Sequence, residues 1–239
     1  MNKQYTIFIS LIVLIVSALA CSKLQPVSPA EDELLDGPIA GLNYEQNARF
    51  AAGDAAFNSE IFTPDKGLGS VFVATSCGSC HAGDGKGHPF TTLTRFGQTD
   101  ETGNHYLEKG GPQLQNRAIP GFMPEQIPAG ATFSKFTPPA NTGLGFIELV
   151  SDADILAMAD PDDANDDGIS GRPNWNHIPS YINPPASAVV QDGKYICRFG
   201  KKAATFSLLH QTVNAYNQDI GITSVYDPTD VYSHHEIDP

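Results

Sequence analysis

Two cysteines and a histidine stand together in the pattern Cys77-Gly78-Ser79-Cys80-His81. Two thiols at this spacing can each add to a vinyl group of haem, and the histidine that follows can bind the iron. A zinc site would need a second pair of ligands, and a thioredoxin-type dithiol would need a βαβ context; neither is evident. The motif therefore predicts one covalent haem c, attached at Cys77 and Cys80, with His81 as the proximal iron ligand.

The ligand on the other side of the iron stays open at this point, because distal ligation varies with function. A methionine before a proline on a loop is a usual choice, and several histidines are alternatives, as is an open iron. The candidates are Met123, His88, His105, His177 and His210. Met158 lies on an apolar helix face, and we expect it in the core.

A second group of oxygen ligands has a recognisable spacing. Asp163, Asn165 and Asp167 alternate along the chain and are followed by Gly168. This pattern matches the first half of a calcium loop of the EF-hand type, although Asn174 stands where a strong site has a bidentate Glu. We expect a Ca²⁺ site here, with a solvated acidic loop as the alternative.

Other charged residues could assist chemistry at a haem. Such residues could bind haem propionates or act on peroxide, but ordinary surface charge is the competing interpretation for each of them. They are Glu108, Glu125, Glu148, Arg117 and Arg198.

The N-terminal residues predict export. Ile7 to Ala20 is an apolar run without charge, too short to span a bilayer as a stable helix, and it ends at Ala18-Leu19-Ala20-Cys21. We expect residues 1–21 to be a lipoprotein-type signal peptide with Cys21 as the lipidated residue. Ordinary secretion with cleavage near Ala20 is the alternative. The expected location is the periplasmic side of a bacterial membrane, with residues 22–41 as a flexible tether.

The remaining residues, 42–239, are expected to form one c-type cytochrome domain. Helical patterns occur at 43–60, 151–159 and 205–216, whereas residues 82–146 are rich in glycine and proline. The predicted fold is mainly α and cytochrome c-like around the haem, with long loops and minor β-hairpins. Cys197 has no disulfide partner in this scheme and is expected to be a small buried apolar residue.

The net charge of −13 argues against nucleic acid as a partner, because a polyanion would be repelled. Such a charge suits a soluble surface and could also steer a basic redox partner.

Several segments occur in an order that resembles one family. They are Phe50-x-x-Gly53-x-x-x-Phe57, Gly67-Leu68-Gly69, the Cys77–His81 motif, Gly83-Asp84-Gly85, Gln113 to Gly121, Gly143-Leu144-Gly145, Ala157 to Arg172, Arg198-Phe199-Gly200 and Asp219 to Thr223. The series resembles the di-haem oxidoreductases, described as peroxidases and sometimes labelled thiol oxidoreductases, distant relatives of bacterial di-haem cytochrome c peroxidases. Members carry a second CxxCH in a C-terminal domain, so the resemblance implies that this chain corresponds to the N-terminal half.

Two functions follow from these patterns, with a structural lipoprotein as a third and weaker one. The first is an electron carrier in the cell envelope, which needs one covalent haem and a redox partner. The second is a peroxidase-like enzyme that depends on a second haem domain, because peroxide reduction takes two electrons and the printed chain has one CxxCH.

Overall fold

The computed structural model describes residues 4, 5, 12, 15, 36–88, 90–97, 99, 100, 103–106 and 109–230. The chain divides into two compact units, Met1–Gly37 and Pro38–Pro239. The proposed signal-peptide cleavage region and Cys21 lie outside the described residues. Among those that are described, no helix combines the length and the apolar character needed to cross a bilayer.

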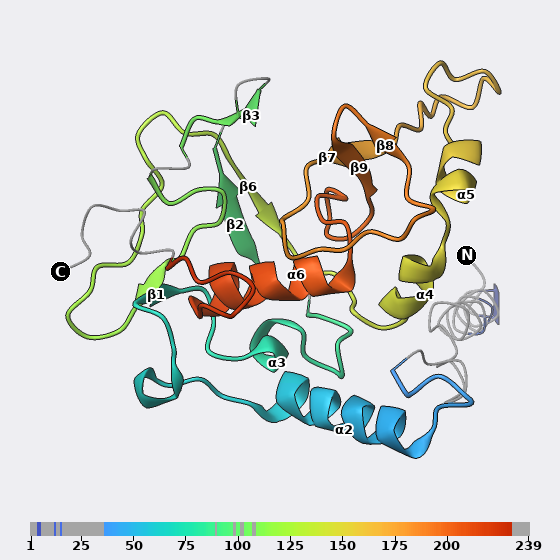
Figure 1. Cartoon of the computed structure of the whole chain (residues 1–239). Helices are drawn as coiled ribbons and strands as arrows, with labels where there is room; N and C mark the ends of the chain where they lie inside the picture. The colour runs from blue at the N-terminus through green and yellow to red at the C-terminus, as the bar shows by residue number, and fades with distance from the viewer. Residues whose placement is uncertain are drawn as a thin grey trace. The chain divides into compact units, whose positions relative to one another are not determined.

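The second unit contains short helices and short strands in mixed order (Figure 1). The helices are α2 (Tyr44–Ser59), α3 (Cys77–Cys80), α4 (Leu144–Leu149), α5 (Asp152–Ala157) and α6 (Leu208–Ala215), with helical turns η2 (Pro64–Lys66) and η4 (Tyr216–Ile220). The strands are β1 (Val71–Phe72), β2 (Leu93–Phe96), β3 (Thr99–Asp100), β4 (Gly103–Asn104), β5 (Arg117–Ala118), β6 (Phe133–Phe136), β7 (Asn174–Asn176), β8 (Val190–Gln191) and β9 (Lys194–Cys197).

The prediction of a mainly α fold is wrong. The described residues form small antiparallel sheets, β1-β5, β2-β6, β3-β4 and β7-β9-β8, beside the helices, so the fold is a mixed α and β arrangement. These strands are two to four residues long, and several pair with partners distant in sequence, as in Leu93 opposite Phe136. Such pairing leaves almost no periodicity to detect, because the alternation of a strand needs several residues to show.

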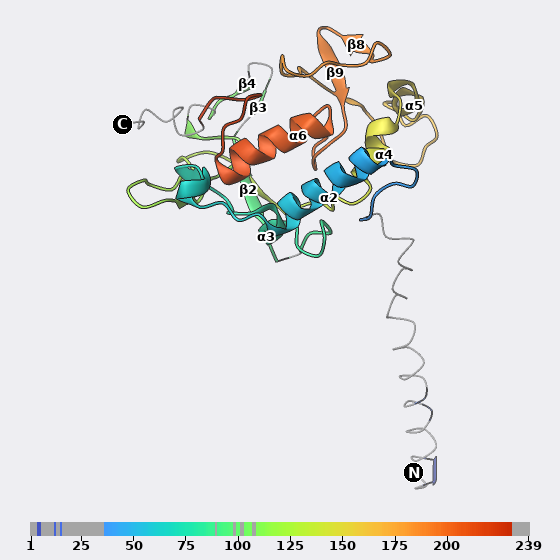
Figure 2. The ribbon, with the colours of Figure 1, turned by 60° about the horizontal axis from the view of Figure 1, so that its bottom comes forward.

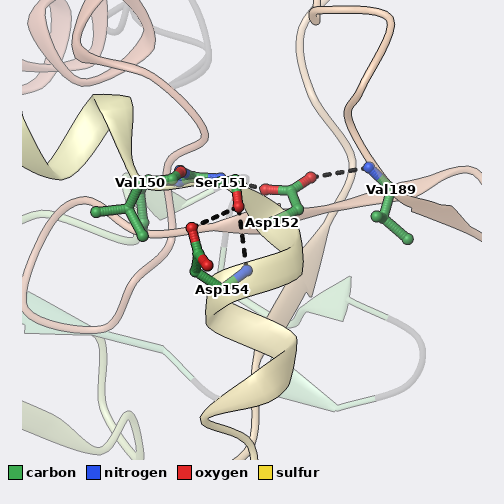
Figure 3. A network of polar contacts seen from close by, with 6 residues as sticks. Val150, Ser151, Asp152, Asp154 and Val189 are labelled. Carbon is green, nitrogen blue, oxygen red and sulfur yellow. Dashed lines mark hydrogen bonds and ion pairs between the residues drawn. The ribbon is translucent and has the colours of Figure 1, made fainter.

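The helices begin where the sequence has capping residues. Asn43 accepts a hydrogen bond from the backbone N–H of Gln46, whose side chain bonds back to Asn43, so a complete capping box starts α2. Ser151 starts α5 by accepting from the N–H of Asp154, and Figure 3 shows this contact. The helices expected at 43–60 and 151–159 are therefore confirmed. Ser207 caps α6, which begins a turn later than predicted.

Two small apolar clusters hold the unit together. One joins Phe62, Leu68 and Phe72 to Ile220, and so connects β1 to the turn η4 that follows α6. The other joins Cys197 to Ile182 and Phe206, which confirms that Cys197 is buried. Figures 1 and 2 show the β7-β9-β8 sheet near the start of α6, and Figure 1 shows β1 near its other end. Met158, expected in the core, is 72% exposed.

Candidate functional site

The Cys77–His81 motif forms a single turn of helix, α3, that starts at a serine cap. The hydroxyl oxygen of Ser76 accepts from the N–H of Ser79 at 3.2 Å, and the N–H of His81 donates to the carbonyl of Cys77 at 2.9 Å. This turn places Cys77 and Cys80 on one short helix with His81 at its end. Both thiols are free and partly exposed.

The turn lies against the end of α2, and a glycine at position 78 eases this approach. A Cβ atom at Gly78 would meet the carbonyl oxygen of Asn58 at 3.2 Å, which is tighter than ordinary contact. The ring of Phe57 lies 5.9 Å from that of His81. The helix predicted at 43–60 therefore supplies one wall of the site.

One nitrogen of His81 is already occupied. Its Nδ1 lies 3.0 Å from the carbonyl oxygen of Pro139, an oxygen that can only accept, so Nδ1 carries the proton. Burial lowers the pKa of His81, and the bond to Pro139 opposes that shift. The ring is therefore neutral near pH 7 with an unprotonated Nε2, which is the form that binds a metal.

The loop that supplies Pro139 is fastened to the residues after His81. The N–H of Asn141 donates to the carbonyl of Gly85 at 2.7 Å, and a Cβ at Gly87 would lie 3.0 Å from the carbonyl of Pro138. These contacts fix the orientation of the imidazole. Two free thiols on a tight turn and a neutral, oriented imidazole fit the requirements of a covalently bound haem c.

A polar cluster, partly buried, lies beside the motif. We define it as Arg95, Gln113, Gln115, Glu125 and Asp219. The side chain of Gln113 donates to the carboxylate of Asp219, and that of Gln115 donates to the carbonyl of Gln218 at 3.0 Å. Burial raises the pKa of both Cys77 and Cys80, and the charge of Asp219 raises each further. Asp219 is therefore close enough to act electrostatically on both cysteines.

Glu125 is held within this cluster by two hydrogen bonds. Its carboxylate accepts from the N–H of Gln115 at 2.7 Å, and its own N–H donates to the carbonyl of Gln115 at 2.9 Å. Burial raises the pKa of Glu125 to about 7, against the opposing effect of the Gln115 N–H. A carboxyl group with this pKa can give or take a proton at neutral pH.

A family model described as "di-haem oxidoreductase, putative peroxidase" matches residues 134–235. Over these residues the chain is similar to this family, which confirms, for that segment, the resemblance inferred from the sequence motifs. The family implies haem as the cofactor. No curated protein and no solved structure matches the chain. The Cys77–His81 motif precedes the matched di-haem oxidoreductase segment. Pro139, which bonds to His81, and Asp219, whose charge acts on both cysteines, lie within that segment.

The candidates for the second axial ligand have varied surroundings. Met123 is 70% exposed, two residues before Glu125. His88, His105 and His177 are exposed; Nδ1 of His88 accepts from the N–H of Phe90, and that of His177 lies 3.2 Å from the carbonyl of Gly193. His210 is buried, where its Nδ1 accepts from the N–H of Phe206. The second axial ligand stays open.

The proposed calcium ligands belong to the matched di-haem oxidoreductase segment. The carboxylate of Asp163 accepts from the N–H groups of Asp167 and Gly168, and the side-chain oxygen of Asn165 also accepts from Asp167. The described part of the chain contains no group of three or more His, Cys, Asp or Glu side chains that could hold a metal ion. The calcium site stays a prediction.

The sequence alone indicates little of this polar cluster. It offers Glu125 as a candidate for haem or peroxide chemistry, with surface charge as the alternative, and predicts no role for Arg95 or Asp219. One signal was available: Gln113 and Gln115 alternate, as on one face of a strand. Among the other charged candidates, Arg198 forms an ion pair with Asp152, and Glu148 accepts a hydrogen bond from the N–H of Leu208, so both stabilise the packing of the fold. Glu108 lies outside the described residues. Arg117 is exposed but acts on the pKa of Cys80.

Proposed function

We propose that this chain binds one haem through Cys77 and Cys80 and serves as an electron-carrying part of a di-haem oxidoreductase in the bacterial cell envelope. The observation that carries the proposal is the bond from His81 Nδ1 to the carbonyl of Pro139, which leaves Nε2 for the iron. A haem held here supplies reversible one-electron chemistry.

A partner with a second redox centre is part of the proposal. Reduction of hydrogen peroxide to two waters consumes two electrons and two protons, and the printed sequence has one CxxCH motif. The second electron would come from another haem, carried by a further domain or by a separate protein. The net charge of −13 favours a donor with a basic surface.

Peroxide reduction within such an assembly is the second candidate function, and Glu125 favours it. Its pKa of about 7 suits a group that transfers protons to the reacting oxygens. Gln115 fixes the position of the carboxylate, so the chain itself would supply the orientation and the proton, and the partner the additional electron.

The location of the protein is a proposal of the same kind. The run that ends at Ala20-Cys21 supports export and lipidation of Cys21. In a bacterial host, Cys21→Ser should release the protein from the membrane fraction, because the lipid anchor supplies the attachment. Membrane association equal to that of the wild type would contradict lipidation.

The two functions are separated by one kinetic experiment. The haem-loaded chain, reduced and mixed with an oxidised partner cytochrome, should exchange electrons rapidly in a stopped-flow spectrometer. With peroxide as the only oxidant and the reduced partner cytochrome as the electron donor, the same chain should turn over slowly. Rapid, sustained turnover by this chain alone, lost in Glu125→Gln, would refute the carrier function and make the enzyme function primary.

A further inference from the structure

Residues 219–221 pack backbone against backbone on the segment that leads into the haem motif. The carbonyl of Asp219 accepts from the N–H of Val73 at 2.7 Å and from that of Ala74 at 3.1 Å. A Cβ at Gly221 would overlap the carbonyl of Val71, and one at Gly69 would overlap Gly221 itself. Cys77 follows Ala74 by three residues, so Asp219 is fixed relative to the first attachment site.

The side chain of Asp219 is also fixed. Its carboxylate accepts a hydrogen bond from the amide of Gln113. Gln113 pairs with Arg95 in an antiparallel bridge, and residues directly opposite in such a bridge project to the same face. Gln113 and Arg95 therefore approach Asp219 from one side, the first through a hydrogen bond and the second through its charge.

The charge of Asp219 reaches both haem-attachment sites. Part of the residue contacts solvent, but its carboxyl group is enclosed by protein; this burial raises its pKa to about 7, and Arg95 opposes the shift. The same charge raises the pKa of the thiols of Cys77 and Cys80. An electrostatic effect on two thiols will persist when the same sulfur atoms hold a redox-active group, because a poorly solvated charge is weakly screened.

We propose that Asp219 is a positioning residue of the haem site, whose carboxylate orients Gln113 and lowers the midpoint potential of the haem attached at Cys77 and Cys80. This inference rests on the proposed function. The physical reason is that a nearby negative charge stabilises the oxidised iron, which carries one more positive charge than the reduced iron.

The test compares Asp219→Asn with a matched control in the same chain. Asparagine keeps the shape and can still accept from Gln113, but it removes the charge. Asp152→Asn is the control, because Asp152 is likewise enclosed, accepts from the N–H of Val189 at 2.8 Å and pairs with Arg198. Figure 3 shows that Asp152 sits at the start of α5, and its charge acts on Cys197.

Spectroelectrochemical titration at mildly alkaline pH supplies the readout. We expect an upward shift of the midpoint potential in Asp219→Asn and no shift in Asp152→Asn. Equal potentials in Asp219→Asn and the wild type, or an equal shift in both variants, would overturn the inference. Absence of covalent haem in the wild type would refute the proposed function itself, which the pyridine haemochrome of the same sample reveals.

A second measurement does not depend on the folding of Asp219→Asn. In Glu125→Gln the other carboxyl group of raised pKa is removed. The charged or titratable groups left near Asp219 and the cysteines include Arg95, Arg117, Glu60 and Tyr216, and His81, the proposed iron ligand, directly follows Cys80. The midpoint potential of this variant should rise as the pH falls through neutrality and Asp219 takes up a proton. A flat profile would overturn the inference.

Discussion

At the scale of single residues, two carboxyl groups link the stability of the protein to pH. Burial raises the pKa of Asp219 and that of Glu125 to about 7 each, well above their values in an unfolded chain. At pH values between the carboxyl pKa of the unfolded chain, about 4, and that of the folded chain, about 7, the folded state binds more protons than the unfolded state. Stability therefore falls as the pH rises from about 4 to about 7 through these two groups.

We expect the double variant Asp219→Asn, Glu125→Gln to lose most of this pH dependence. Urea denaturation followed by circular dichroism at several pH values measures the effect. The wild type should show a higher unfolding midpoint at mildly acidic than at neutral pH, and the double variant a flatter profile. A wild-type midpoint that rises steadily over the same interval would contradict the raised pKa values.

The residue types at the Cys77–His81 motif are sufficient to predict covalent haem attachment, whereas the contacts that support the motif were not predictable. Cys77, Cys80 and His81 are adjacent in sequence, so their spacing alone indicates haem attachment. Pro139 lies 58 residues after His81, and Asp219 is farther still along the chain. Contacts of this kind depend on tertiary packing, and a carboxylate such as Glu125 carries no local mark of its burial.

At the scale of elements, the contact between Gly69 and Gly221 ties the end of the chain's described part to β1. Gly221 has a φ of 74°, and an added Cβ would overlap the carbonyl of Val71. Gly67 has a similar φ of 86° but nothing within 4 Å of its Cβ position. A comparison of alanine substitutions at Gly67 and Gly221 therefore separates the cost of backbone strain from the cost of steric overlap.

Gly67→Ala should cost about 1 kcal/mol of unfolding free energy, because alanine is strained at positive φ. Gly221→Ala should cost about 3 kcal/mol or more, since overlap with the backbone of β1 adds to the strain. Chemical denaturation of both variants measures the difference. Equal losses would show that residues 219–221 do not pack tightly on β1.

Local signals explain why the helices were predicted better than the strands. α2 and α5 each begin at a capping residue, Asn43 and Ser151, whose role is legible in the sequence. β1 and β5 are two residues long and exist only through each other, with Val71 opposite Ala118. The sequence of such short strands is indistinguishable from that of loops. For this reason the sequence predicts a mainly α fold.

At the scale of the whole molecule, the Asp163–Gly168 loop offers a test of ligand-linked stability. If Asp163, Asn165 and Asp167 bind Ca²⁺ only in the folded state, excess Ca²⁺ should raise the thermal midpoint and a chelator should lower it. Asp163→Ala should remove the difference. Equal midpoints under both conditions, with no Ca²⁺ bound in a calorimetric titration, would contradict the site.

The central claim is that this chain holds haem covalently at Cys77 and Cys80. The most direct measurement is the pyridine haemochrome spectrum of the protein, matured with haem in a bacterial host, after extraction with acidified acetone. The account predicts that the wild type retains haem with a c-type spectrum, and that the double variant Cys77→Ala, Cys80→Ala retains none. Complete extraction of haem from the wild type, or retention in the double variant, would contradict the account.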